Sequence, residues 1–190
     1  KRLIYQLVSF ARKSRNCSTT VLEGDGDYLL RELSANRIDL CLTNYPPAVN
    51  MTELFNAKLL ASVPISIFGT RKFRNLKANF PQSLNSQPFI LPTLHSKLRH
   101  DLGHYFRANG ILVDVVIETQ DTSVQKLLGT EGMGLAPLPD FAGKELVDEK
   151  KLINIGTLPQ VKEDFWLISS IRKIPNPLAI DLMENFSLSI

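Results

Sequence analysis

The sequence predicts an α/β protein of two lobes with a ligand cleft between them. Apolar segments of strand length alternate with amphipathic helical segments along most of the 190 residues. Two β–α–β patterns stand out, one near each end of residues 18–137. Such alternation is typical of α/β folds with mostly parallel sheets. Ligands bind these folds where strand carboxyl ends meet helix N-termini.

The first quarter of the chain sets this pattern. Apolar residues recur at i, i+3/i+4 and i+7 over about residues 1–14, which predicts an amphipathic helix. The β-branched stretch Ser18–Glu23 predicts a strand. After two glycines, a helix is expected over residues 28–35. The apolar run 38–43 predicts a strand covered on both faces, as in a parallel sheet.

The rest of the chain continues the alternation. The further predicted strands are residues 54–60, 64–68, 88–92, 113–119, a short strand that ends at Pro139, 152–155 and 165–171. The further predicted helices are a short one near 81–85, one over 96–109 closed by Gly110, one N-capped by Asp121, one over 141–151 and a last one that starts at Pro177.

Composition limits the functional classes. With 44% hydrophobic residues, the chain can form one large domain or two small lobes. A net charge of +3, from 22 Lys+Arg and 19 Asp+Glu, does not indicate a nucleic-acid-binding surface. Two cysteines, Cys17 and Cys41, do not make a disulfide framework, and we expect reduced thiols in a cytoplasmic protein. Neither a signal peptide nor a membrane-spanning apolar run is visible.

All three histidines fall in "LHSKLRHDLGH", which contains the H-D-x-x-H pattern of His100, Asp101 and His104. Helical geometry places His100 and His104 opposite the apolar stripe. A catalytic zinc needs a third protein ligand, and His95 lies more than a helical turn from His100. A hydrolase is therefore the weakest of the alternatives, and adventitious metal binding is a further one. The predicted buried stripe is Leu98, Leu102, Tyr105 and Phe106.

Other chemical patterns are missing. The glycines of "EGDGD" and "GTEGMG" do not form a phosphate-binding loop, and no calcium-loop pattern is present. Ser96 lacks the G-x-S-x-G context of a nucleophile, and neither cysteine has a histidine partner. We therefore predict no catalytic residues, no metal site and no cofactor.

Polar residues follow three predicted strands and start the helices beyond them. They are Thr43 and Asn44, then Thr93, His95 and Ser96, then Thr119, Gln120 and Asp121. Ser96 is a natural N-cap, although bare N–H groups at that helix start could instead take an anion. Each of these residues could equally be a plain cap. Three such strand ends in a two-lobed chain are typical of a small-ligand cleft.

The order of motifs resembles the effector-binding (regulatory) domain of LysR-type transcriptional regulators. "VLEGDGDYLLRELSANRIDLCLT" is similar to the family's E-G-x-x-x-x-L-x-x-L-x-x-x-x-I/L-D-L block, and "LLASVPISIFGT" to its crossover into the second lobe. "LRHDLGHYFRANGILVDVVIET" and "VQKLLGTEGMGLAPLP" are similar to its R-x-x-L-x-x-x-F-x-x-x-G helix and its L-x-x-G-x-G-I/L-A-x-L-P signature. "ILPTLHSKLRHDLGHYF" and "ETQDTSVQKLLGTEGMGLAPLP" look most like the NhaR type, the regulators of sodium/proton antiporter genes.

The resemblance implies two Rossmann-like lobes, in the type 2 arrangement of periplasmic binding proteins. Lobe I would be residues 1–67 and 163–190, and lobe II residues 68–162, with hinges near 68–71 and 165–169. The effector, a small molecule or an ion, would sit between the lobes and shift their arrangement. By position, the candidate effector-binding residues are Thr43, Asn44, Thr93, His95, Ser96, Thr119, Asp121 and Ala136.

The resemblance also implies partners. Such domains form antiparallel homodimers, here with residues 1–14 against 96–109 of the partner, and a full-length tetramer is possible. If the NhaR likeness holds, Na⁺ is a candidate effector, with oxygens of Glu118, Asp121 and other strand-end residues as ligands.

This chain departs from the family pattern at its start. The family's domain opens with a strand before the first helix, and a winged helix-turn-helix precedes that strand. Neither is visible here, so we expect a truncated form that contacts DNA only through the missing N-terminal domain. The alternative from another class is a stand-alone solute-binding protein of the same fold.

Overall fold

The structure is a computed structural model that describes residues 2–14, 17–51 and 53–189. It divides into two compact units: unit 1 contains residues 1–62 and 164–190, and unit 2 contains residues 63–163. The chain passes from unit 1 to unit 2 within strand β2, Phe55–Gly69, and returns within strand β6, Ile153–Ser170.

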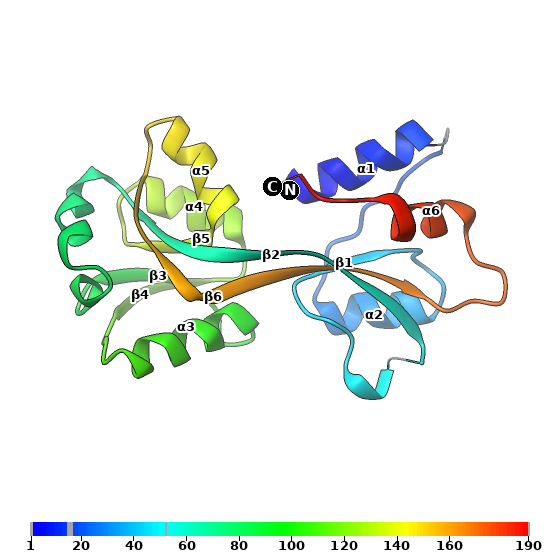
Figure 1. The fold of residues 1–190 in the computed structure, drawn as a ribbon, viewed down its shortest axis with the longest axis horizontal. Coiled ribbons are helices and arrows are strands. Elements are labelled where there is room, and N and C mark those ends of the chain that lie inside the picture. The colour runs from blue at the N-terminus through cyan, green and yellow to red at the C-terminus, as the bar shows by residue number, and fades with distance from the viewer. Residues whose placement is uncertain (1, 15–16, 52, 190) are drawn as a thin grey trace. The chain divides into compact units, whose positions relative to one another are not determined.

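Unit 1 places helices on both sides of its strands. Its further elements are α1 (Arg2–Ser14), α2 (Gly26–Ser34), β1 (Cys41–Thr43), a 3₁₀ turn (Val49–Met51) and α6 (Pro177–Asn185). β1 pairs antiparallel with β6, and Cys41 lies opposite Ile168. Helices α1 and α6 lie on one side of this strand pair and α2 on the other (Figure 1).

The core of unit 1 follows from the alternation of side chains along β6. Ile168 packs with Leu33 of α2, whereas its neighbour Leu167 packs with Leu182 of α6. Successive strand residues point to opposite faces. Because both are buried, β6 needs a helix on each face, and this explains its unbroken apolar run near the end.

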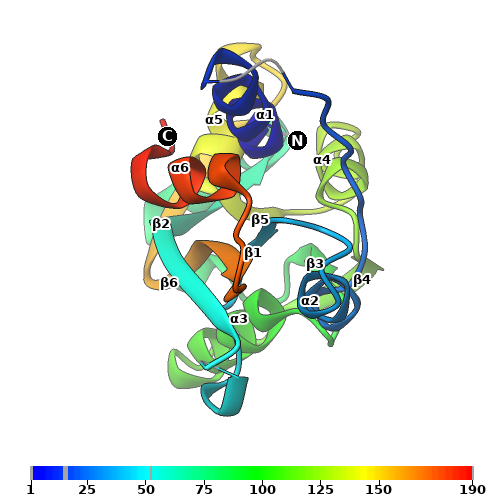
Figure 2. The same ribbon diagram turned by 90° about the vertical axis from the view of Figure 1, so that its right-hand side faces the viewer.

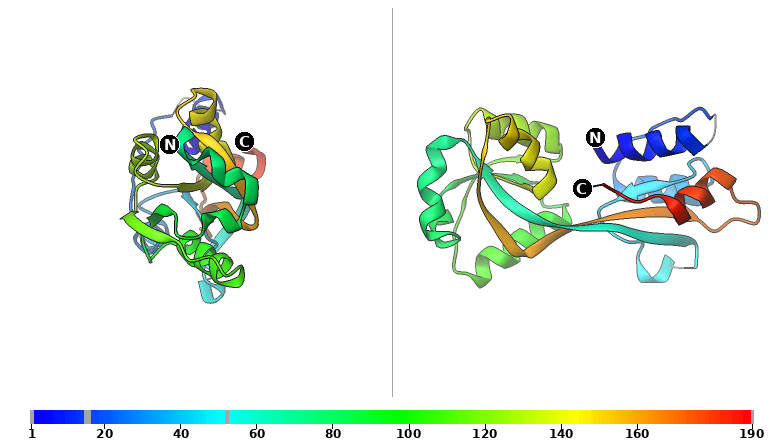
Figure 3. Two further views of the ribbon diagram at one scale, coloured as in Figure 1. Left: turned by 90° about the vertical axis from the view of Figure 1, so that its left-hand side faces the viewer. Right: turned by 45° about the horizontal axis from the view of Figure 1, so that its top comes forward.

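Unit 2 also places helices on both sides of its strands. Its elements are 3₁₀ turns over Arg71–Asn79 and Gln82–Leu84, β3 (Pro88–Pro92), α3 (Lys97–Ala108), β4 (Asp114–Thr119), α4 (Thr122–Thr130), β5 (Ala136–Pro139) and α5 (Asp140–Asp148). β3 pairs parallel with β4, and β5 pairs antiparallel with β2. Helix α3 lies on one side of the strands, and α4 and α5 on the other (Figures 1 and 3).

The apolar stripe of α3 is confirmed. Its four residues are buried, and they join the main core of unit 2 with Phe89 and Leu91 of β3. His100 and His104 are exposed on the opposite side of the helix. Hydrophobic periodicity was therefore sufficient to orient this helix.

The predicted strand Ser18–Glu23 is wrong. Residues 17–25 form an extended, irregular stretch that runs from the end of α1 to the start of α2 (Figure 2). Within the described residues, the backbone of residues 18–24 makes no hydrogen bond to another backbone group. A strand exists only with a neighbour that pairs its N–H and C=O groups, and no strand of the described residues pairs with this segment.

Two pairs of predicted strands are each a single strand. Residues 54–60 and 64–68 belong to β2, and residues 152–155 and 165–171 fall largely in β6. Pro64 suggested a break, but proline removes only one donor from a ladder. In β6 the polar stretch between the two predicted strands still buries Leu158 and Val161, so it continues as strand.

The expectation of mostly parallel sheets is also wrong for the described pairings. β3–β4 is parallel, whereas β1–β6 and β2–β5 are antiparallel. A strand buried on both faces has the same apolar pattern in either direction. The sequence pattern therefore indicates burial, and it carries no information on strand direction.

Candidate functional site

The carboxyl ends of β3 and β4 bring polar residues to one edge of unit 2. The two strands are parallel, and Pro92 lies opposite Thr119 in their register. Residues that follow β3, such as Thr93, therefore lie near those that follow β4. Helices α3 and α4 start directly beyond this edge, so two helix N-termini lie next to it.

The N-terminus of α3 has no side-chain cap. Ser96 occupies the N-cap position with extended backbone, but its hydroxyl makes no capping hydrogen bond. Its own N–H donates to the carbonyl of Thr93 at 3.0 Å. The first N–H groups of a helix without a cap need another acceptor, and the helix dipole favours a negative one. Of the two alternatives for Ser96, the structure supports the bare helix start.

The N-terminus of α4 is capped in the ordinary way. Asp121 Oδ1 accepts a hydrogen bond from the N–H of Ser123 at 2.6 Å, which confirms the predicted cap. Thr119 Oγ1 accepts from the N–H of Asp121 at 3.1 Å. Both residues therefore already stabilise the turn between β4 and α4.

At the same edge, an ion pair connects α3 to the end of β4. Arg99 Nη1 lies 2.6 Å from Glu118 Oε1 and also donates to the carbonyl of Pro92 at 3.0 Å. The Arg99 side chain is largely buried and that of Glu118 is partly exposed. The pair holds α3, the end of β3 and the end of β4 together. The site reasoning from sequence missed Arg99, which a sequence signal could have found because it begins the family's R-x-x-L helix motif.

Gln125 adds a side-chain link between β3 and β5 beneath the edge, beside the backbone bridge from Phe89 to Leu135. This buried side chain of α4 donates from Nε2 to the carbonyls of Ile90 at 2.8 Å and Pro137 at 3.3 Å. It thereby links β3 to β5 through one amide. Sequence reasoning missed it, although it is a polar residue on the inward face of an otherwise apolar helix pattern.

The remaining candidates of unit 2 differ in accessibility. His95 is exposed and Thr93 is partly exposed. The side chain of Ala136 is completely buried and packs with Phe68 and Leu138 in the core. Its part in a binding site stays a prediction that this burial does not favour.

In unit 1, Thr43 and Asn44 end β1 beside the start of α2. Thr43 is buried and donates from Oγ1 to the carbonyl of Tyr45 at 2.6 Å. A Cβ on Gly26 would lie 1.4 Å from the Tyr45 hydroxyl, so only glycine at this position lets the phenol approach the helix start. Burial, and secondarily the carboxylate of Asp27, raises the pKa of Tyr45.

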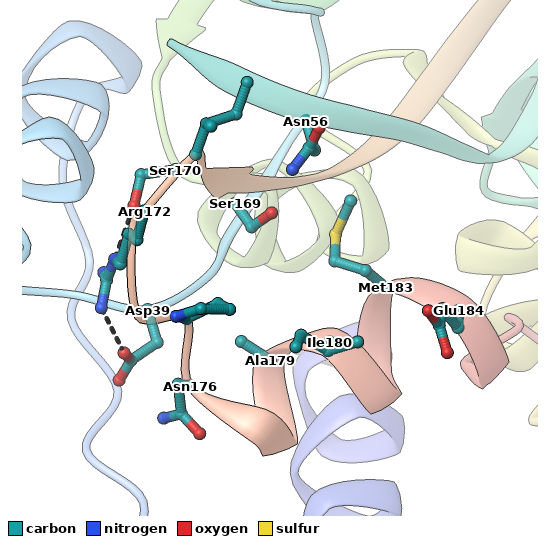
Figure 4. A pocket seen from close by; sticks show the side chains of 12 residues that line it. Asp39, Asn56, Ser169, Ser170, Arg172, Asn176, Ala179, Ile180, Met183 and Glu184 are labelled. Atoms are coloured by element: carbon teal, nitrogen blue, oxygen red, sulfur yellow. Dashed lines mark hydrogen bonds and ion pairs between the residues drawn. The ribbon is translucent and has the colours of Figure 1, made fainter.

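Unit 1 also has two surface hollows that the sequence did not suggest. A pocket of about 260 Å³ lies between the end of β6 and α6 (Figure 4). Beside it, Arg172 pairs with Asp39 at 3.0 Å and donates to the carbonyl of Ile38 at 2.6 Å. A groove of about 560 Å³ lies between α1, residues 17–22 and β1. None of the predicted site residues lines either hollow.

The described residues contain neither a metal-binding cluster nor a membrane-spanning helix. No group of three or more His, Cys, Asp or Glu side chains in ranges 2–14, 17–51 and 53–189 is placed to hold a metal ion. In the same ranges, no helix is long and apolar enough to cross a bilayer.

The two-unit mixed α/β fold is that of the type 2 periplasmic-binding-protein-like class predicted from the sequence. Residues 1–186 match the family model for the LysR substrate binding domain. The chain therefore belongs to this family, and it is an effector-binding regulatory domain of a LysR-type regulator.

Among characterised proteins, the chain is 22% identical over 155 residues to the transcriptional activator protein NhaR of Escherichia coli (strain K12). That match covers 82% of this chain and 51% of the relative, so the chain spans about half the length of that protein. The weak similarity supports the NhaR-type subgroup predicted from the motifs.

Solved structures show the same fold. The cofactor-binding domain of the Cbl transcriptional regulator has a TM-score of 0.79 at 16% identity, covering 96% of this chain and 82% of that one. The regulatory domain of CcmR from Synechocystis PCC6803, in complex with 2-PG, has a TM-score of 0.69 at 17% identity, covering 97% and 92%. These relatives are regulators and not enzymes, so the hydrolase alternative is set aside.

Proposed function

We propose that this domain senses a small anionic effector at the carboxyl ends of β3 and β4, within a transcriptional regulator of the NhaR type. The observation that carries the proposal is the uncapped N-terminus of α3 at Ser96. An anion at a helix N-terminus accepts hydrogen bonds from free N–H groups and gains from the helix dipole. Thr93, His95 and Thr119 supply further polar groups around this position.

A cation fits the same edge less well. The carboxylates that could bind Na⁺ already have partners, since Glu118 pairs with Arg99 and Asp121 caps α4. Hard cations need several oxygen ligands, and these two would have to leave existing interactions. The CcmR regulatory domain binds 2-PG, which is consistent with a ligand other than a metal ion at this fold.

Thr43 and Asn44 at the end of β1 form a second set of proposed effector contacts, in unit 1. We propose that an effector with different affinities for two conformations of the regulator shifts their populations. The coupling free energy between effector binding and DNA binding is then set by the difference between the effector's affinities for the two conformations. The regulator is favoured over the stand-alone solute-binding alternative because the characterised relative is a transcriptional activator.

We propose a homodimer in which α1 of one chain packs against α3 of the other. The exposed face of α3, with His100, His104 and Arg107, would lie at that interface. DNA would be bound only by the part of the regulator outside this chain, since the chain spans about half of the curated relative. We also propose a cytoplasmic location, because a transcriptional regulator acts where the DNA is.

The decisive experiment fills the bare helix start with a carboxylate. Ser96→Asp should cap α3 and raise stability by about 1 kcal/mol, and it should weaken binding of 2-PG, phosphate and sulfate at least about tenfold by charge repulsion. Isothermal titration calorimetry measures the affinities. Ser123→Asp, in the first turn of α4, is the matched control.

Two results would contradict the proposal. One is unchanged anion affinity in Ser96→Asp together with the expected gain in stability. The other is that none of the three anions binds the original chain at millimolar concentration. A Kd of about 1 mM is roughly the weakest affinity at which an effector would act.

A further inference from the structure

Positive charge is concentrated in one segment of unit 2. Residues 54–100 contain seven Lys and Arg residues and no Asp or Glu. Four of the seven fall within the nine residues of the 3₁₀ helix Arg71–Asn79, which lies at the left edge of unit 2 in Figure 1. The whole chain has 22 Lys+Arg against 19 Asp+Glu, so this helix carries a local excess that the net charge of +3 conceals.

The 3₁₀ geometry arranges three of these cations in a row. Such a helix has three residues per turn and rises about 2.0 Å per residue, so side chains at i and i+3 are eclipsed. Arg71, Arg74 and Lys77 have this spacing and follow one another at steps of about 6 Å. Phe73 and Leu76, also three apart, both pack into the main core of unit 2, whereas the three cations are exposed. We call these three residues the cationic row.

The cationic row has no acidic partner in the part of the chain that the structure describes. None of the ion pairs there includes a residue of the row. The fourth cation, Lys72, is held in place instead: it donates to the carbonyl of Gly132 and lies 4.8 Å from the ring centroid of Phe73. The helix is therefore fastened to unit 2 by Lys72 and Phe73, and the charges of the row remain available to a partner.

The surface beside the cationic row is low. Asn75 and Ala78 each follow a residue of the row along the chain, and both are exposed. Their side chains are short, so they leave space next to the long side chains of the row. A rod-shaped partner can approach the backbone of this helix and still reach the guanidinium and ammonium groups.

We propose that the cationic row binds an acidic α-helix of another protein, one with carboxylates four residues apart on one face. Four residues of α-helix span about 6 Å, which is the step of the row. Each cation would then face one carboxylate. Complementary charge of this kind fixes the orientation of a partner and speeds its association. The proposal concerns unit 2 alone and does not depend on the effector or its site.

A nucleic-acid backbone fits the row less well. Binding to DNA strengthens with the number of phosphates that a protein neutralises, and a single row of three cations neutralises few. The next residues along the helix surface, Asn75 and Ala78, add no charge to widen the row. Duplex DNA is therefore the competing ligand in the test.

A synthetic two-stranded coiled coil supplies the acidic helix for the test. One version carries glutamate at four solvent-facing positions spaced i, i+4, i+7 and i+11, and the other carries glutamine there. In about 20 mM salt, the glutamate version should shift the amide NMR signals of residues 71–78 of the 190-residue chain, and the glutamine version should not. In about 150 mM salt, the affinity should fall severalfold because exposed charges are screened.

A triple variant tests the row itself. Arg71→Gln, Arg74→Gln and Lys77→Gln together should weaken binding of the glutamate coiled coil about tenfold, because three exposed ion pairs are lost. Reversing the charges is the stricter test. With Arg71→Glu, Arg74→Glu and Lys77→Glu, the chain should reject the glutamate coiled coil and bind a version that carries lysine at the same four positions.

A matched control removes the same charge elsewhere. Lys144→Gln, Lys162→Gln and Lys173→Gln replace three cations that are exposed and lie outside the row. This variant should change the affinity less than about threefold, since it alters only the net charge of the chain. All six substituted side chains are exposed, so both glutamine variants should keep the Tm of the original chain.

Any of four results overturns the proposal. The glutamate and glutamine coiled coils could bind equally well. The glutamate version could fail to bind at about 1 mM. The row variant and the control variant could lose the same affinity. Finally, duplex DNA of about 20 base pairs could bind through the row more tightly than the glutamate coiled coil, which would make this a nucleic-acid surface.

Discussion

Arg99 and Glu118 form a 2.6 Å ion pair that joins the first turn of α3 to the end of β4. The same guanidinium donates to the carbonyl of Pro92, the last residue of β3. One largely buried side chain thus holds three elements at the edge where the effector is proposed to bind. The pair also adds no net charge at that edge, because Glu118 neutralises Arg99.

Removal of Arg99 should destabilise unit 2. Arg99→Met loses the carbonyl hydrogen bond and leaves Glu118 unpaired, and we expect a decrease of roughly 1–2 kcal/mol in the free energy of unfolding. Urea denaturation measures it. Lys97→Met is the control, since its exposed i,i+4 pair with Asp101 should contribute less than about 0.5 kcal/mol. Equal effects of the two substitutions would contradict the role assigned to Arg99.

Asp121→Ala should remove the cap of α4 and cost about 1 kcal/mol, and Asp121→Asn should restore most of the loss. The same variants test the sodium hypothesis. Because the carboxylate already caps a helix, we expect the shift in Tm between NaCl and KCl of equal ionic strength to be the same in Asp121→Ala and the original chain. A sodium-specific stabilisation that disappears in Asp121→Ala but persists in a capped control such as Ser123→Ala would favour a cation site instead.

Stability should fall in alkali because of Cys41. Burial raises the pKa of its thiol from 9.0 to about 11. The folded chain therefore holds this proton more tightly than the unfolded chain, and the resulting stability is complete below pH 9 and lost as the pH rises to 11. The loss should approach roughly 2 kcal/mol.

The variant Cys41→Val distinguishes the loss of stability caused by the Cys41 thiol from any loss caused by the tyrosines. Tyr45 and Tyr105 also have raised pKa values, and both remain in the variant. Chemical denaturation at pH 8, 9, 10 and 11 should give a smaller decline in Cys41→Val than in the original chain. Parallel declines would show that the Cys41 thiol is not the group responsible.

Local patterns predicted the helices well. The apolar stripe placed α3 correctly, and Asp121 and Pro177 marked the starts of α4 and α6. These features depend on residues a few positions apart. The strand at Ser18–Glu23 failed because a strand depends on a distant neighbour, and β2 and β6 were divided because a proline or a polar stretch resembles a break.

The positions of several candidate site residues at strand ends were predictable from the sequence, but their interactions were not. The sequence placed Thr93, Ser96 and Thr119 at strand ends, and the parallel register of β3 and β4 brings those ends to one edge. It could not show that Ser96 leaves its helix uncapped, since an N-cap residue does not guarantee a cap. Arg99 and Gln125 were missed because their partners are backbone carbonyls and side chains on other elements.

The contrast between the two thiols has a practical consequence. Both cysteines line the groove, but Cys41 is buried and its raised pKa keeps it protonated near neutral pH, whereas Cys17 is only partly buried. Thiolates and not thiols react with alkylating reagents. A maleimide dye or spin label should therefore attach selectively at Cys17, giving a single spectroscopic probe at the groove without any engineered cysteine.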